Sequence, residues 1–276
     1  MKIWFQSMGG YRYNPAFEEY GKTLEKQCMA AARPGTEVYV TGLPVAMTER
    51  DRYKSVQYFH GVQSLNNMLQ AEAEGYDAFV IGCSFDAWMD EGRELLSIPV
   101  IGLAQANLFL ASMYGDLFAI PTCEPHIVQK YDQLIRKYGL EAHYLRGPYI
   151  NPISMSAVSA ALSNPEAAQP VVDGFKSLFN KAIADGASVL IPVPANIYQL
   201  YTKTGGSNSL NGVTILDPVA TVIKFAEMMV DLKKMGIEVS RKLHVYGALG
   251  EDLRSQLLNM YAPVFKINNP EKKIEQ

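Results

Sequence analysis

Short runs of apolar residues alternate along this chain with longer segments in which apolar positions recur at helical spacing. The short runs end in glycine, proline or small polar residues, as strands do. The expected strands are residues 3–6, 37–41, 78–82, 99–102, 117–121, 142–145, 188–193 and 213–216. The expected helices are residues 15–32, 52–74, 124–137, 166–184 and 218–234. This alternation predicts an α/β protein built from βαβ units, whose mostly parallel sheets bind ligands at the carboxyl ends of their strands.

The chain also repeats part of its own layout. Residues 75–83 begin with a glycine after a long helix, run through an apolar strand and end at Cys83. Residues 186–194 have the same layout and end at Pro194, and a shorter apolar strand follows in both cases. We interpret the chain as two similar half-domains with a cleft between their strand ends. Cys83 and Pro194 are then equivalent positions that face the cleft.

Composition and charge narrow the class of protein. The chain has 276 residues, of which 48% are hydrophobic and 19% charged, as in a packed globular protein. Its formal net charge of −3 disfavours binding to nucleic acid, which needs a cationic face. No apolar stretch approaches the roughly 20 residues of a membrane span, and the apolar start is shorter than the roughly 7–15 residues of a signal peptide core. The three cysteines make a poor disulfide framework, so we expect a cytoplasmic protein with reduced thiols.

Cys83 is the strongest catalytic candidate. It directly follows the expected strand 78–82, and Gly82 lets the backbone approach a ligand closely while Ser84 adds a hydroxyl. A helix is expected to begin near Ser84 or Asp86, and the unsatisfied amides of a helix start lower a thiol pKa and bind anions. The competing interpretation is a small buried hydrophobic residue, which describes most cysteines. The position at a strand end favours function.

The other two cysteines carry weaker signals. Cys28 lies at helical spacing inside the first expected helix, which indicates a core position. Cys123 follows the expected strand 117–121 at the cleft-facing end of the second half. It, Glu124 or His126 is therefore a candidate acid or base, and the alternative is that this segment is a loop and a helix cap.

No cofactor motif stands out in the sequence. The histidines and cysteines show no metal-ligand spacing, and residues 204–207 lack the Lys-Ser/Thr pair of a P-loop. The loop at residues 7–11 follows the first strand without a GxGxxG pattern. It either gives amides and a hydroxyl to an anionic ligand or is an ordinary turn. No nucleotide, flavin or metal cofactor is predicted.

Two segments carry a family resemblance: GYDAFVIGCSFD at residues 75–86 and RELLSIPVIG at residues 93–102. They resemble the aspartate/glutamate/hydantoin racemase superfamily, in particular its hydantoin and allantoin racemases, with maleate isomerase and arylmalonate decarboxylase. Residues 216–220 and 239–246 look like the closing segments of that branch. The resemblance implies two pseudo-symmetric Rossmann-like or flavodoxin-like half-domains, each with a parallel four-stranded sheet, and an active site in the cleft between them.

The expected domain boundaries follow from the last long helix. Because the helix at 218–234 is expected to return to the first half, the first half-domain comprises residues 1–112 with 218–246, and the second comprises residues 113–217. Residues 247–276 are expected to form an extension with one helix and a polar tail.

One departure from the family pattern bears on mechanism. The family's racemases use two cysteines, one to remove a proton and the other to deliver a proton to the opposite face. Pro194 stands at the second position and has no proton to exchange. Arylmalonate decarboxylase is similar in keeping one cysteine, although in its second half, and maleate isomerase is similar in using the first-half cysteine as a nucleophile. The resemblance therefore implies a one-thiol enzyme.

The leading functional hypothesis is a cofactor-independent isomerase in which the Cys83 thiolate attacks or deprotonates a small carboxylate or cyclic ureide. The alternatives are a Cys83-dependent hydrolase of a cyclic amide or imide, a decarboxylase of a small dicarboxylate, and a non-catalytic ligand-binding protein. Water, Cys123 or Tyr198 would carry the second proton. The expected substrate-binding residues are Ser7, Ser84, Phe85, Thr122, Cys123, Pro194, Ala195, Asn196 and Tyr198. We also expect a homo-oligomer that binds neither nucleic acid nor membranes.

Overall fold

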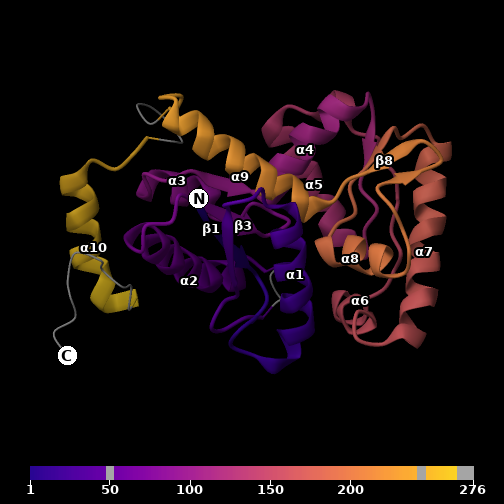
Figure 1. Ribbon diagram of the computed structural model, residues 1–276, viewed down its shortest axis with the longest axis horizontal. Coiled ribbons are helices and arrows are strands. Elements are labelled where there is room, and N and C mark those ends of the chain that lie inside the picture. Colours follow the sequence, from indigo (N-terminus) through magenta and orange to yellow (C-terminus); the bar gives the residue numbers. More distant parts are fainter. Residues whose placement is uncertain (48–52, 241–246, 266–276) are drawn as a thin grey trace.

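A four-stranded, fully parallel sheet forms the centre of the first half of the chain (Figure 1). The computed structural model describes residues 1–47, 53–240 and 247–265. The sheet has the strand order β2-β1-β3-β4. Its strands are β1 (Lys2–Ser7), β2 (Glu37–Thr41), β3 (Ala78–Gly82) and β4 (Val100–Gly102). In register, Ile3 pairs with Val38 on one side and Ala78 on the other, so the carboxyl ends of β1 and β3 lie side by side.

Helices cover both faces of this sheet because successive side chains of each strand point to opposite faces. Ile3 and Phe5 pack with α1 (Glu18–Ala31), α4 (Leu103–Tyr114) and α9 (Pro218–Lys234). Trp4 packs on the other face with α2 (Lys54–Ala73) and α3 (Met89–Leu95). Asn14 begins the first helical segment by accepting a hydrogen bond from the Ala16 amide, ahead of a 3-10 turn at Pro15–Phe17.

The second half is built around a sheet with the order β5-β6-β8-β7. Its strands are β5 (Phe118–Ala119), β6 (Val189–Leu190), β7 (Ser209–Leu210) and β8 (Val213–Ile215). Its helices are α5 (Pro125–Tyr138), α6 (Met155–Ala161), α7 (Pro165–Ala184) and α8 (Ala195–Lys203). The two-half α/β fold is thus confirmed.

The second sheet departs from the expected parallel arrangement at its edge. β7 runs antiparallel to β8, and Asn211 and Gly212 connect them with positive φ angles of 51° and 81°. An Asn-Gly pair suits a two-residue hairpin turn, because both positions require φ above zero. The expectation of four parallel strands is therefore wrong for this sheet. The strand expected at 142–145 is also wrong, since Glu141–His143 form a 3-10 turn and Tyr144 alone bridges to Phe118.

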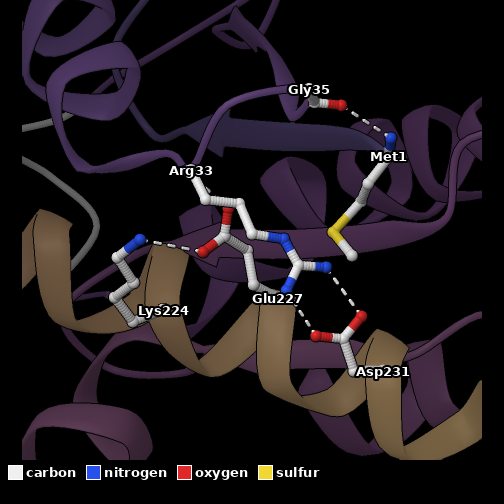
Figure 2. A network of polar contacts seen from close by, with 6 residues as sticks. All are labelled: Met1, Arg33, Gly35, Lys224, Glu227 and Asp231. Carbon is white, nitrogen blue, oxygen red and sulfur yellow. Dashed lines mark hydrogen bonds and ion pairs between the residues drawn. The ribbon is translucent and has the colours of Figure 1, made fainter.

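The long helix α9 brings the chain back to the first half, where it contacts α1 and α4 (Figure 1). Arg33 ties it there: the guanidinium donates two hydrogen bonds, of 2.5 and 2.7 Å, to Asp231 (Figure 2). The Arg33 amide donates to Glu227 over 2.8 Å, and the Lys224 ammonium meets the other oxygen of that carboxylate at 3.0 Å. Burial alone would raise the pKa of Glu227, but these hydrogen bonds outweigh it and lower that pKa.

A final helix, α10 (Glu251–Phe265), lies beside α2 at the far end of the first half (Figure 1). Leu258 is fully buried in the core that contains Trp4, and Arg254 meets Glu72 at 2.7 Å. The expected extension therefore contains a docked helix. The family-like segment at 239–246 falls mostly on residues 241–246, which lie outside the described residues. The domain boundaries stay a prediction.

Candidate functional site

A cavity of about 440 Å³ lies where the strand ends of the first half face the helices of the second. Residues 82–85 line it from the turn after β3, and Phe17 and Tyr20 from the α1 side. The second half contributes α6 and the start of α8. The site is therefore formed between the two halves, as the sequence predicts for an α/β protein of this kind.

Cys83 lies in the cavity wall with 5% of its surface exposed. The close approach of Gly82 to β1 positions it: a Cβ atom at Gly82 would lie 2.3 Å from the Phe5 ring and 2.8 Å from the Gln6 carbonyl oxygen. Only glycine fits there, so the chain leaves β3 tightly against β1 and presents the next side chain to the cavity.

The helix expected to begin near Ser84 or Asp86 is not present. The Asp86 amide donates to the Cys83 carbonyl oxygen over 3.2 Å in a turn, and α3 begins only at Met89. Asp86 and Trp88 interrupt any helix here, because their φ angles of 47° and 63° lie in the left-handed region. Cys83 therefore lacks the helix-start amides that the sequence analysis assigns to it.

Asp86 instead fixes this turn to α4. Its buried carboxylate accepts hydrogen bonds from the amides of Ala104 and Gln105 at 2.7 and 2.6 Å and from the Tyr138 hydroxyl at 2.8 Å. Burial raises the pKa of Asp86 to about 6, although these donors and the nearby Arg93 oppose the shift. The carboxylate is thus the acceptor for two amides at the start of α4, and these hydrogen bonds fix the turn that follows Cys83.

A helix start does face the cavity, but it comes from the second half. Pro194 is the N-cap of α8, and Ala195 and Asn196 in its first turn line the cavity. The first amides of a helix have no intrahelical partner and carry its positive dipole end. The Asn196 side-chain amide donates to the Ser159 hydroxyl over 2.9 Å. Its carbonyl oxygen Oδ1 is buried and has no hydrogen-bond partner among the described residues.

Five of the nine expected substrate-binding residues line the cavity: Ser84, Phe85, Pro194, Ala195 and Asn196. The other four do not line it: Ser7, Thr122, Cys123 and Tyr198.

The four residues outside the cavity wall have other surroundings. The Ser7 hydroxyl accepts from the Gly9 amide over 3.2 Å, and Thr122 is fully buried where it bridges to Val193. Burial raises the pKa of Cys123 to about 12, so this thiol stays protonated at neutral pH. Burial, with the charge of Asp217, also raises the pKa of Tyr198 to about 12, and its hydroxyl accepts from Asn208 at 2.9 Å. A role for these residues in substrate binding stays a prediction.

The remaining candidates do not line the cavity. Cys28 lies in α1 with its side chain fully buried in the core, in agreement with the expected core position. The Glu124 carboxylate accepts from the Met155 amide and lies 3.0 Å from His126, whose ring in turn meets Phe85. None of the three cysteines forms a disulfide.

The lining residues that sequence reasoning missed include three serines and a tyrosine. Ser156, Ser159 and Ser163 recur at helical spacing on α6 and just after it, so their spacing alone places three hydroxyls on one face. Tyr20 on α1 also lines the cavity. Burial raises the pKa of Tyr20. A side-chain hydrogen bond with Ser7 acts in the opposite direction, and the nearby Cys28 and Cys83 thiols raise this pKa further. The interactions of Tyr20 with Ser7 and Cys83 join residues from different segments, so no local sequence pattern predicts them.

The fold and the site together define a two-half α/β protein with a thiol in its central cavity. A family model described as Asp/Glu/Hydantoin racemase matches residues 14–226, and the chain belongs to this family. It is 27% identical to a hydantoin racemase of Pseudomonas sp. (strain NS671) over 217 residues, which cover 77% of this chain and 82% of that protein.

Solved structures agree with the fold. The structure of allantoin racemase from Klebsiella pneumoniae superposes with a TM-score of 0.69 at 21% identity, covering 91% of this chain and 94% of that one. The structure of allantoin racemase from Pseudomonas fluorescens superposes with a TM-score of 0.68 at 18% identity, covering 90% of this chain and 97% of that one. In the part of the chain that the structure describes, no helix has the length and apolar character of a membrane span, and no cluster of three or more His, Cys, Asp or Glu has the arrangement of a metal site.

Proposed function

We propose that this protein is a cofactor-independent isomerase in which the Cys83 thiolate removes a proton from the carbon beside a carbonyl group of a cyclic ureide. Membership of the racemase family supports the class of reaction, and the printed names of its relatives, hydantoin and allantoin racemases, support the class of substrate. The observation that carries the choice of substrate is the unsatisfied oxygen of Asn196.

A buried acceptor without a partner costs about 1–3 kcal/mol, which a bound donor recovers. Oδ1 itself is shielded from the cavity although the Asn196 side chain lines it, so a bound cyclic ureide supplies this donor through its ring N–H once that side chain turns toward the cavity. The neighbouring ring carbonyl accepts from the amides at the start of α8, where Ala195 and Asn196 line the cavity. A simple carboxylate only accepts hydrogen bonds and leaves Oδ1 unsatisfied. Of the two substrate classes expected from the sequence, the cyclic ureide therefore matches better.

The same helix start assists the chemistry. Removing the proton leaves an enolate, with negative charge on the carbonyl oxygen, and the proton becomes the S–H of Cys83. Amides and a positive dipole end directed at that oxygen stabilise the charge as it develops. The thiol and the anion-stabilising amides thus come from different halves of the protein.

Isomerisation also needs a donor on the opposite face of the enolate, and Pro194 has no proton to give. We assign this role to Tyr20, whose side chain lines the same cavity and packs against the cores of both halves. Burial raises the pKa of Tyr20 above its ordinary value of 10, so the phenol carries its proton at neutral pH. The phenol O–H bond breaks and the new C–H bond forms. Solvent then reprotonates the tyrosinate and takes the proton from the Cys83 S–H group, which restores the thiolate.

Substrate incubated in deuterated water tests the proposal. We expect solvent exchange and loss of optical activity for a 5-substituted hydantoin, both abolished in Cys83→Ser and retained in Cys28→Ser. Replacing Asn196 by leucine should lower kcat/KM about a hundredfold, because the ring N–H of the substrate loses its acceptor while the backbone amides of α8 stay in place. The matched variant Ser159→Ala keeps Oδ1 and should lose far less. Exchange that persists in Cys83→Ser would disprove the thiolate mechanism.

Pro194 also favours a second candidate, a cysteine hydrolase of cyclic amides. Hydrolysis needs one nucleophile and water rather than two opposed acids, so it tolerates the missing second thiol. Cys83 would attack the ring carbonyl, expel the ring nitrogen as an amine and release the acid when water cleaves the thioester. An acyl adduct on Cys83 detected by intact-protein mass spectrometry, with ring-opened product, would favour this reaction over isomerisation. Release of CO₂ without an adduct would favour the decarboxylase hypothesis.

A further inference from the structure

A second cavity, of about 700 Å³, lies between α2, α5 and α10. Its described lining includes the apolar side chains of Val62, Leu65, Trp88, Leu134 and Leu257. Among the described lining residues, Phe85 is the one that this cavity shares with the Cys83 cavity. The residues before Phe85 line the first cavity, and Ala87 and Trp88 after it line the second. Successive residues of this segment therefore line first one cavity and then the other, and Phe85 stands at the change.

Both halves of the protein hold the Phe85 ring. Its backbone belongs to the turn after β3, and its ring meets two rings of α5 edge-on, at centroid distances of 6.4 Å from His126 and 6.5 Å from Tyr131. The ring also packs against the core of each half. Such contacts keep an aromatic ring in one place, and here that place is the wall between two cavities.

We propose that Phe85 is a partition that limits the size of the group that binds beside Cys83, and that the second cavity accepts a larger apolar substituent once the ring is removed. The inference rests on the proposed function in that the substituent is the 5-substituent of a cyclic ureide. A substituent that extends from Cys83 toward the second cavity meets the Phe85 ring, and a biaryl group reaches that space only where the ring is removed. The apolar lining of the second cavity suits an aryl group.

Thiol labelling tests the partition without relying on enzyme activity. Cys83 is alkylated with N-ethylmaleimide and with a maleimide that carries a biphenyl group, and intact-mass and peptide analysis give the two rates. We expect Phe85→Ala to raise the ratio of biphenyl to ethyl rates about tenfold or more, and Phe85→Leu to raise it less. The control Phe59→Ala removes an exposed ring of α2 that lines neither cavity, and it should leave the ratio unchanged.

A double variant shows whether the second cavity is the space that is gained. Leu134 lines the second cavity and not the first. Adding Leu134→Trp to Phe85→Ala should fill that space and return the ratio to the wild-type value. If Phe85→Ala leaves the ratio unchanged, or if Leu134→Trp fails to reverse the gain, the partition is disproved.

Turnover of ureides then tests the substrate assignment separately. In Phe85→Ala, kcat/KM for a 5-(biphenylmethyl)hydantoin relative to 5-methylhydantoin should rise by about the same factor as the labelling ratio. A changed labelling ratio without turnover of either hydantoin would leave the partition standing and contradict the proposed function. Unequal shifts in the two assays would contradict the assignment of the substituent to the second cavity.

Discussion

Replacing Asp86 by asparagine removes a carboxyl group on which two physical effects oppose each other. Burial favours the neutral acid, and it raises the pKa of Asp86 from 3.8 to about 6. The hydrogen bonds from Tyr138, Ala104 and Gln105 and the charge of Arg93 favour the carboxylate and limit the rise. Because asparagine is nearly isosteric and never titrates, the variant isolates the balance between these effects.

The sign of the pH dependence follows from the direction of the shift. Between pH 3.8 and pH 6 the folded protein holds a proton on Asp86 that the unfolded chain has released, so raising the pH favours unfolding. The stabilising contribution is fully present below pH 3.8 and is lost as the pH rises through 6. At about 1.4 kcal/mol per pKa unit, the rise from 3.8 to about 6 is worth about 3 kcal/mol in full, and most of it falls between pH 4 and pH 7. Over that range the free energy of unfolding of the wild type should therefore fall by roughly 2–2.5 kcal/mol relative to Asp86→Asn.

Urea unfolding followed by circular dichroism at pH 4, 5, 6 and 7 measures this difference. The other titrating groups are common to both proteins, so subtracting the two free energies of unfolding at each pH cancels them. The difference should decline with pH and level off above pH 6. A flat difference, or one that grows with pH, would refute the reasoning. A flat difference would mean that the hydrogen-bond donors around Asp86 balance its burial, and a growing one would mean that they outweigh it.

Three further variants test other parts of the structure. Cys28→Ala should lower the free energy of unfolding by about 1–2 kcal/mol in urea titrations and leave activity unchanged, because the thiol is fully buried and outside the cavity; a loss of activity would contradict its core role. Leu258→Ala should cost about 2–3 kcal/mol and speed amide exchange in α10, whereas Met260→Ala, 69% exposed, should do neither. Glu227→Gln should destabilise the protein by about 1–3 kcal/mol at pH 7, and because the pKa of Glu227 is lowered, this difference should shrink as the pH falls below 4.5. Urea titrations at pH 7 and pH 3 measure the last effect, and a difference that grows at low pH would contradict it.

The spacing of apolar residues predicted the first sheet and the helices α1, α2, α5, α7 and α9, because that spacing is a property of each segment alone. The expected helix at 218–234 coincides with α9, and the expected strand at 78–82 coincides with β3. The antiparallel edge strand β7 was missed although Asn211 and Gly212 signal a hairpin, because the strand itself has only two residues. The helices α3, α6 and α8 are short, and they were missed because few turns give little periodicity. The 12-residue helix α4 was missed as well, because it is apolar nearly all round and its apolar positions do not recur at helical spacing.

The site was only partly predictable because tertiary contacts shape the turn after Cys83. Asp86 and Trp88 adopt positive φ, a conformation that aspartate reaches more readily than most residues but that tryptophan rarely adopts. Tertiary contacts compensate: Asp86 caps α4, and the Trp88 ring packs so closely on Gly61 that a Cβ atom there would lie 2.4 Å from the indole nitrogen. The cleft itself was predictable, because it depends on the topology of parallel strands.

The two halves present different chemistry at the positions that the internal repeat predicts to be equivalent, with a thiol in the first and a helix start without a thiol in the second. Proton removal and proton return should therefore be separable. If Cys83 alone removes the proton, its thiol also exchanges with solvent and returns deuterium to the same face, whereas inversion requires the donor assigned to Tyr20.

Tyr20→Phe tests this separation in deuterated water. The variant should lower inversion of a 5-substituted hydantoin by about a hundredfold or more while exchange with retention continues, since a general acid typically contributes 10²–10⁴-fold. Chiral chromatography measures inversion, and mass spectrometry of the unchanged enantiomer measures exchange. Tyr138→Phe is the matched control, because that hydroxyl binds Asp86 and does not line the cavity. Equal loss of exchange and inversion in Tyr20→Phe would contradict the assignment of Tyr20 as the donor, since a donor on the opposite face is needed for inversion alone.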